Sequence, residues 1–287
     1  MCGIMGYVRM TENTSKMKPI LRDALANIQE RGTHASGFTV VNREGAVFSV
    51  KHHIPSSGLA HTKWFKKNVG NDLDLMIGHA RFATHGAPEN NDNNHPFWSK
   101  DFRWSIVHNG VLMGGYDDVK DVLVTECDSE VILRYIEKYG MIEGYRKFTR
   151  QVMGRYAVLV VDAIENKVFA FRDEAQPLTV VNLSKSVGGI VMASTPTILR
   201  KSLMGYGIRS DIDKFFTEVP KDALWEFSPG TKPRMRSKTR SSRMGTDWSR
   251  RYFNGNGYHT EYGTVYQRKG TISSGGYSYR DGMWQED

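Results

Sequence analysis

A thiol stands at the second position of the chain, directly after the initiator methionine. Methionine aminopeptidases remove Met1 when the next residue is small, which would leave Cys2 with a free α-amine. Such an amine has a reference pKa of about 7.7–8.0, so its neutral fraction near pH 7 can take the thiol proton. Cys2 would then be a nucleophile that carries its own general base. Met-Cys-Gly alone favours a simpler interpretation, an unreactive cysteine at the start of a buried strand.

A second segment, GHARFATHG at 78–86, offers groups that could bind a substrate. Arg81 follows a predicted strand, and its planar guanidinium matches a carboxylate with two parallel hydrogen bonds. Thr84 and His85 add donors in the turn that follows. For an isolated arginine, a salt bridge in a surface loop is the simpler interpretation.

A third group of residues could stabilise developing charge. Asn109 and Gly110 follow an apolar strand, and a side-chain amide N–H and the next backbone N–H can point at one oxygen, as a tetrahedral oxyanion requires. An Asn-Gly pair alone is more often a simple turn. Asp128 could receive an ammonium group, although a lone aspartate before a helix is more often an N-cap. Asp128 or Ser129 is the expected N-cap of the helix that follows.

The patterns between these segments predict an α+β fold. Apolar residues at helical spacing predict helices over 20–28, with Pro19 in the first turn, over 131–139, and after Pro196. Hairpins are expected at 40–50 and 155–171, and further strands at 75–77, 104–107, 178–182, 188–193 and 223–227. Many strands with few helices indicate largely antiparallel sheets covered by helices.

Composition excludes several classes of protein. Hydrophobic residues make up 39% and charged residues 24% of the 287 residues, as in globular proteins. No apolar run approaches the roughly 20 residues of a membrane span, and the N-terminus does not resemble a secretory signal. With two cysteines, neither a disulfide framework nor a cysteine-rich zinc site is expected. We expect a cytoplasmic protein without metal or cofactor.

The end of the chain differs from the rest. The net charge is +8, and residues 231–287 contain 11 basic and 5 acidic residues but few aliphatic ones. Such a segment cannot bury enough apolar surface to offset its ordering entropy. We expect a domain over 2–230 and a basic tail over 231–287 that is flexible or docks on a partner. Arginines interleaved with aromatic residues could also bind nucleic acid.

Taken in series, the motifs resemble those of the class II glutamine amidotransferases, whose N-terminal-nucleophile hydrolase domain occurs in glucosamine-6-phosphate synthase and amidophosphoribosyltransferase. The matching segments are CGIMG at 2–6, RGTHASG at 31–37, GHARFATHG at 78–86, NNHPF at 93–97, HNG at 108–110 and CDSE at 127–130. His34 stands where the family usually has Asp, Phe82 replaces Trp or Tyr, and Ala80 replaces Thr or Val. The resemblance implies a four-layer αββα sandwich of two mainly antiparallel sheets.

The resemblance also implies a role for each site residue. Cys2 would attack the side-chain amide of L-glutamine and form a γ-glutamyl thioester, with its α-amine as the base. The oxyanion would be held by Asn109 and Gly110. The α-carboxylate would be bound by Arg81 with Thr84 and His85, and the α-ammonium by Gly110 and Asp128. Arg31 would orient the terminus or a closing loop.

Family members usually pass ammonia to a fused acceptor domain, whereas the match here ends near residue 230. The sequence therefore predicts a glutaminase that delivers ammonia to a separate synthase subunit. Two alternatives remain open. The chain could hydrolyse another γ-glutamyl amide without ammonia transfer, or it could be a non-enzymatic nucleic-acid-binding protein on the same fold.

Overall fold

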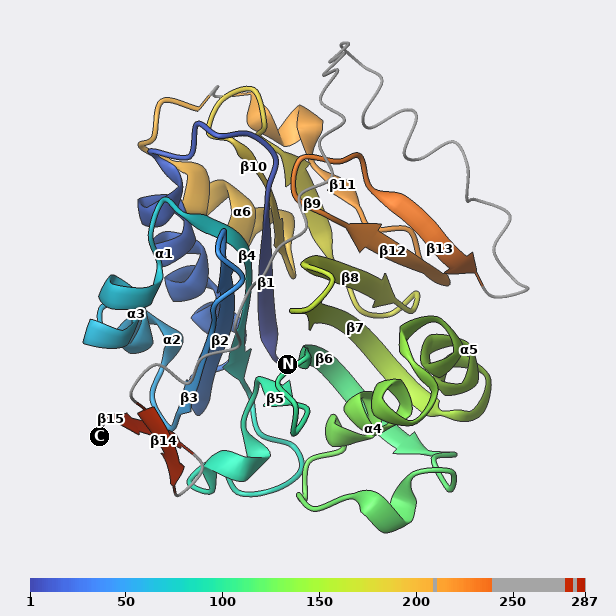
Figure 1. Ribbon diagram of the computed structural model, residues 1–287. Helices are drawn as coiled ribbons and strands as arrows, with labels where there is room; N and C mark the ends of the chain where they lie inside the picture. Colours follow the sequence, from blue (N-terminus) through green and yellow to red (C-terminus); the bar gives the residue numbers. More distant parts are fainter. Residues whose placement is uncertain (209–210, 239–276, 281–282, 287) are drawn as a thin grey trace.

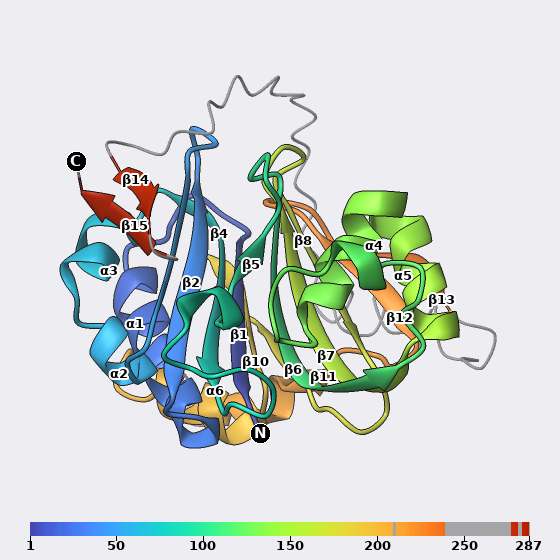
Figure 2. The same ribbon diagram turned by 90° about the horizontal axis from the view of Figure 1, so that it is seen from below.

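Two antiparallel sheets stack face to face and carry helices on both outer sides (Figures 1 and 2). The computed structural model describes residues 1–208, 211–238, 277–280 and 283–286. Helices α1 (Met17–Asn27), α2 (Ser56–Leu59), α3 (Lys63–Asn68) and α6 (Pro196–Leu203) lie outside the first sheet, and α4 (Glu130–Tyr139) and α5 (Met141–Gln151) lie outside the second. This arrangement confirms the predicted α+β fold and its four αββα layers.

The first sheet has seven strands in the order β11-β9-β10-β1-β4-β2-β3. Their bounds are β11 (Thr217–Glu218), β9 (Thr179–Asn182), β10 (Gly189–Ala193), β1 (Gly3–Arg9), β4 (Leu73–Arg81), β2 (Ala35–Asn42) and β3 (Val47–His52). The second sheet has six strands in the order β13-β12-β8-β7-β6-β5. They are β13 (Arg234–Lys238), β12 (Ala223–Phe227), β8 (Lys167–Arg172), β7 (Met153–Asp162), β6 (Trp104–Gly114) and β5 (Phe97–Trp98). A separate hairpin joins β14 (Tyr277–Arg280) to β15 (Met283–Glu286).

Alternation along β1 divides its side chains between two cores. Ile4 and Val8 pack between the sheets, whereas Met5 and Tyr7 pack against the helices of the first sheet. All four are fully buried, because successive side chains of a strand point to opposite faces and both faces of this strand are covered. The near-continuous apolar sequence of β1 follows from this burial.

The predicted helices over 20–28 and 131–139 are confirmed as α1 and α4, and the helix after Pro196 as α6. The predicted N-cap position of α4 is confirmed at Ser129, but the side chain does not cap the helix. The Ser129 hydroxyl instead bonds to His108 Nδ1 at 2.7 Å. The Asp128 carboxylate instead accepts a hydrogen bond from the backbone N–H of Leu112. Both side chains connect the start of α4 to β6.

Both predicted hairpins are confirmed. Between β2 and β3, the Asn42 side-chain oxygen accepts hydrogen bonds from the N–H groups of Glu44 and Ala46, and Gly45 has a φ of 84°. Between β7 and β8, Asn166 has a φ of 52°, a conformation that asparagine tolerates better than most residues.

The second sheet extends into the segment assigned to the tail from the sequence. Strand β13 pairs with β12, with Ala223 opposite Lys238 and Glu226 opposite Arg234. Most of the remaining tail lies outside the described residues. Within the described part of the chain, no helix has the length and apolarity needed to cross a membrane.

Candidate active site

The pairing of β1 with β4 brings the N-terminus beside the point where the GHARFATHG segment leaves β4. Gly3 is opposite Ala80, so Cys2 lies next to the point where β4 ends at Arg81. The Cys2 Sγ accepts a hydrogen bond from the Phe82 N–H at 3.4 Å and lies 3.6 Å from the Phe82 carbonyl oxygen. Met1 precedes the half-buried Cys2 and is 67% exposed. Residues eighty positions apart in the sequence thus meet where β1 begins and the neighbouring central strand β4 ends.

The glycine after Cys2 is required by packing within the chain. A Cβ at Gly3 would lie 2.3 Å from the carbonyl oxygen of Ile28, so any larger residue would push β1 away from the end of the first helix. Gly3 thus permits a close backbone approach that holds Cys2 near the segment after α1.

That segment contributes Arg31, the last residue of the short 3-10 helix η1 (Ile28–Arg31). Its Nε donates to the Cys2 carbonyl oxygen at 2.7 Å. Burial lowers the pKa of the Arg31 guanidinium from its ordinary value, and the negative charges of Glu30 and of a Cys2 thiolate act against that shift. The side chain therefore fixes the backbone of the second residue directly.

Burial is the main influence on the thiol itself. It raises the pKa of Cys2 above the ordinary value, and the Asp128 carboxylate acts in the same direction. The Phe82 N–H, the N-terminal ammonium and the Arg81 guanidinium oppose the shift. The pairing of β1 with β4 places Cys2 beside Arg81, and the charge of Asp128 also acts on the thiol. A thiol with a raised pKa stays protonated at neutral pH and needs a base to become a nucleophile.

Arg81 is buried beneath the loop that follows it. Its Nη1 donates to Asn94 Oδ1 at 2.7 Å, and its Nη2 donates to the carbonyl oxygens of Gly86, at 2.9 Å, and His85. Thr84 and the rest of His85 are exposed. The guanidinium thus organises residues 85–94 around itself, and its contact with His85 is to the backbone rather than to the side chain.

Two of the departures from the family pattern contact each other. The His34 ring stacks on the Phe82 ring, with centroids 5.0 Å apart and an angle of 28° between planes. His34 Nδ1 also accepts from the backbone N–H of Ala83 at 3.0 Å. The backbone N–H of His34 donates to the Arg81 carbonyl oxygen at 3.0 Å. The histidine thereby holds the backbone that carries the Phe82 N–H, the donor to Cys2.

Asn109 and Gly110 lie inside β6, which continues to Gly114 rather than ending at the Asn-Gly pair. Gly110 has a φ of 149°, and a Cβ there would lie 1.8 Å from the Arg155 carbonyl oxygen. Only glycine fits this close approach of β6 and β7. Asn109 is fully buried, and its Nδ2 donates to Gln176 Oε1 at 2.9 Å. None of the sequence motifs contains Gln176.

Asp128 connects the start of α4 to the same strand. Its Oδ2 accepts from the backbone N–H of Leu112 at 2.6 Å, two residues beyond Gly110. Its negative charge also raises the pKa of His108 against the lowering caused by burial. The carboxylate is thereby fixed near Asn109 and Gly110 without belonging to their strand.

Three buried histidines pack inside the protein without carrying charge at neutral pH. His79 stacks on His95 with centroids 3.9 Å apart, and His79 Nε2 lies 3.0 Å from the His108 carbonyl oxygen. Burial lowers the pKa of His79 to about 3 and also lowers the pKa values of His95 and His108. The neutral rings of His79 and His108 make hydrogen bonds, whereas neither ring nitrogen of His95 has a partner among the described residues and this ring only stacks.

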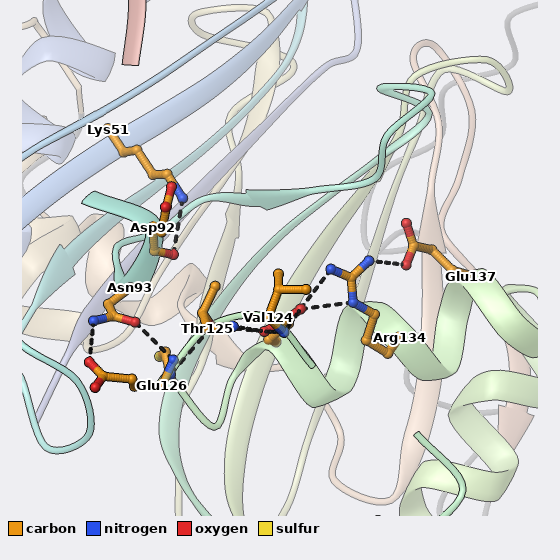
Figure 3. Close-up of polar contacts among 10 residues, drawn as sticks. Lys51, Asp92, Asn93, Val124, Thr125, Glu126, Arg134 and Glu137 are labelled. Atoms are coloured by element: carbon orange, nitrogen blue, oxygen red, sulfur yellow. Dashed lines mark hydrogen bonds and ion pairs between the residues drawn. The ribbon is translucent and has the colours of Figure 1, made fainter. Parts of the chain in front are cut away.

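A polar network links the loop over Arg81 to the loop before Asp128 (Figure 3). Asn93 Nδ2 donates to the Glu126 carboxylate at 2.9 Å, and the Glu126 N–H donates back to Asn93 Oδ1 at 3.0 Å. On one side, the Lys51 ammonium donates to the Asn94 carbonyl at 2.9 Å. On the other side, the Glu130 carboxylate accepts from the backbone of residues 124 and 125 and from Arg134. The two loops are therefore joined by side chains of the protein itself.

Comparison with known proteins agrees with this architecture. The model of the glutamine amidotransferase domain family matches residues 57–223. The glutamine–fructose-6-phosphate aminotransferase (isomerizing) of Geobacillus kaustophilus (strain HTA426) is 35% identical over 192 residues, and that of Listeria innocua serovar 6a is 30% identical over 198 residues. Each alignment covers 63% of this chain and 30% of the relative.

Solved structures show the same fold at lower identity. Glutamine phosphoribosylpyrophosphate amidotransferase from B. subtilis superposes with a TM-score of 0.55 and 19% identity, covering 79% of this chain and 47% of that one. A glutamine aminotransferase class-II domain protein from Silicibacter pomeroyi gives a TM-score of 0.51 and 14% identity, covering 83% and 100%. The chain belongs to the glutamine amidotransferase domain family, in its class II, and spans about a third of the length of the aminotransferases it matches.

Proposed function

We propose that this chain hydrolyses L-glutamine to glutamate and ammonia through a γ-glutamyl thioester on Cys2. The observation that carries the proposal is the contact between the Cys2 thiol and the Phe82 N–H, directly beside Arg81. This contact joins the expected nucleophile to the expected substrate-binding segment. Membership of the family supplies the class of reaction.

Removal of Met1 makes the α-amine of Cys2 the general base. The amine takes the thiol proton, and the sulfur attacks the side-chain amide carbon of glutamine. The negative charge that develops on the amide oxygen is held by the Asn109 side-chain N–H and the Gly110 backbone N–H. The C–N bond then breaks, and the nitrogen leaves as ammonia with the transferred proton. A water attacks the thioester, which releases glutamate and restores the thiol.

The charged groups around the thiol are opposite in sign to the α-carboxylate and the α-ammonium of an amino acid. Arg81, with Thr84 and His85, binds the α-carboxylate, and Asp128 with Gly110 binds the α-ammonium. The position of Arg81 at the end of β4 beside Cys2, and the hydrogen bond that holds Asp128 on the Leu112 N–H two residues beyond Gly110, support this assignment. Arg31 keeps Cys2 in place through its carbonyl oxygen.

The ammonia acceptor in this proposal is a separate synthase subunit. The alignments with the aminotransferases cover only 30% of those proteins, so most of their length has no counterpart in the match. Residues 2–230, with β13, form the glutaminase unit in a cytoplasmic, reducing compartment that keeps Cys2 as a thiol. The basic segment that follows contacts the partner or a nucleic acid. A pull-down should recover more partner with the full chain than with a variant ending at Lys238. Equal recovery would show that the basic segment does not contribute to partner binding.

A glutaminase assay tests the central claim. Purified protein should release glutamate and ammonia from glutamine in equal amounts, and mass spectrometry of the same sample should show loss of Met1. A set of other γ-glutamyl amides, assayed in parallel, should be cleaved more slowly. Turnover of glutamine by protein that retains Met1 would overturn the assignment of the base, and the absence of turnover with a processed N-terminus would overturn the activity.

A further inference from the structure

The Asn109 side chain is held by a residue from a distant part of the chain. Its Nδ2 donates to Gln176 Oε1 at 2.9 Å, across a separation of 67 residues. Asn109 is fully buried and Gln176 is 5% exposed, so the bond lies in the interior. A hydrogen bond between amides in such surroundings is not weakened by competition with water, and losing one partner is costly.

Among the described residues, Gln176 is the only hydrogen-bond partner of the Asn109 side chain. Asn109 Oδ1 is buried and has no partner there. The orientation of the amide about its last torsion therefore rests on the bond to Gln176, because that torsion has a broad, shallow preference of its own. An amide group is planar and carries two N–H bonds about 120° apart. Fixing one N–H on Gln176 also fixes the direction of the other.

The position of Gln176 is itself fixed by the turn after β8. Asp173 Oδ1 accepts from the N–H groups of Ala175, at 3.0 Å, and Gln176, at 2.8 Å. The Gln176 carbonyl oxygen accepts from Arg172 Nη1 at 3.3 Å. The Asp173 N–H donates to the Tyr156 carbonyl on the adjacent strand at 2.9 Å. The side chain of Gln176 thus projects from a backbone that is held at several points.

We propose that Gln176 is a positioning residue that aims the second N–H of Asn109 at the oxygen of the reacting amide. The proposal rests on the function proposed above. Gln176 binds no part of the substrate in this scheme and acts only through Asn109. Its contribution appears when charge develops on the oxygen, and not when glutamine first binds.

Gln176→Met tests the proposal, because methionine is unbranched and of similar length but only a weak acceptor. The expected result is a fall in kcat of about tenfold to a hundredfold, with the KM for glutamine changed less than about twofold. Loss of an interaction made in the transition state lowers kcat in this way, and removal of one oxyanion donor typically costs about 10²–10³. Gln176→Ala should behave in the same way. Titration of active sites with a glutamine-analogue alkylator gives kcat per folded enzyme.

A double-mutant cycle separates positioning from general damage. In an Asn109→Ala background, Gln176→Met should change kcat by less than about twofold, since the residue it positions is absent. Gln151→Met is the matched control. It removes a side-chain oxygen that accepts from the Tyr135 hydroxyl at 2.8 Å and should leave kcat unchanged.

Two results would overturn the inference while leaving the proposed function intact. One is wild-type kcat in both Gln176 variants. The other is an equal loss of kcat from Gln176→Met with and without Asn109. Failure of the wild-type protein to hydrolyse glutamine at all would instead overturn the proposed function, and the inference with it.

Discussion

The guanidinium of Arg31 donates from Nε to the backbone carbonyl of Cys2 at 2.7 Å, which ties the end of η1 to the residue before β1. In the proposed mature chain Cys2 is the N-terminal residue, so a peptide bond holds it on one side only. Arg31 supplies part of that constraint from outside the strand, and Gly3 permits the approach that makes it possible.

Loss of this bond should slow catalysis. We expect Arg31→Met to lower kcat for glutamine hydrolysis about tenfold or more, because misplacing a reacting group by about 1 Å can cost about a hundredfold. Arg31→Lys should recover little, since an ammonium lacks the planar fork that reaches the carbonyl. Arg200→Met, which removes a mostly exposed arginine paired with Asp213, is the control. Wild-type kcat in Arg31→Met would contradict the role.

The two cysteines should differ in reactivity towards a glutamine-analogue alkylator. Cys2 should be modified once per chain, and Cys2→Ala should abolish the adduct. Cys127 should stay unmodified, because burial raises the pKa of its thiol to about 11 and leaves no thiolate near pH 7. Peptide mass mapping distinguishes the two sites. Labelling of Cys127 in the folded protein would show that this part of the structure opens.

Asp128→Asn should weaken glutamine binding and lower the pKa of the Cys2 thiol. The amide oxygen can still accept from the Leu112 N–H, so the fold should be retained. Loss of the carboxylate should raise the KM for glutamine about tenfold to a hundredfold, since a hydrogen bond to a charged group contributes about 1.5–3 kcal/mol. Because Asp128 raises the pKa of Cys2, its neutralisation should move the pH profile of Cys2 alkylation to lower pH. An unchanged profile would contradict the proximity of the two groups.

Gly110→Ala should destabilise the protein strongly. The new Cβ would lie 1.8 Å from the Arg155 carbonyl oxygen at a φ of 149°. We expect the free energy of unfolding in urea to fall by more than about 2 kcal/mol. Gly140→Ala is a matched control with a φ of 75° but no atom within 4 Å of the added Cβ. It should cost about 1 kcal/mol from backbone strain alone. Equal losses in the two variants would contradict the steric argument.

Lys51 should make stability depend on pH. Burial lowers the pKa of its ammonium to about 8 in the folded protein, from an ordinary value of 10.5. Between these values the folded state releases its proton first, so the unfolded state binds more protons and stability rises with pH. The unfolding free energy of the wild type relative to Lys51→Met should therefore increase by up to about 3 kcal/mol between pH 7.5 and 10.5. Lys100→Met, at an exposed lysine, controls for general effects of pH. A constant difference would contradict the shift.

Local sequence predicted much of the framework. Helical spacing gave α1 and α4, and the two Asn-containing turns gave both hairpins. Helix α5 was not predicted, because it begins directly after Gly140 and contains Gly144, and glycine costs about 1 kcal/mol within a helix. The packing of α5 against α4 nevertheless favours glycine at position 144. A Cβ at Gly144 would lie 2.7 Å from the Tyr135 carbonyl oxygen, so the glycine allows α4 and α5 to approach closely.

The sequence by itself determined the α+β class, the family and the positions of the segments that carry reactive groups, because these depend on local periodicity and on motifs in fixed order. Only the tertiary structure decided which groups meet. The contact of Phe82 with Cys2, the burial of Arg81 under its own loop and the bond from Asn109 to Gln176 all depend on strand order and register. Such partners lie tens of residues apart, and no local pattern specifies them, since they are selected by the packing of the whole sandwich.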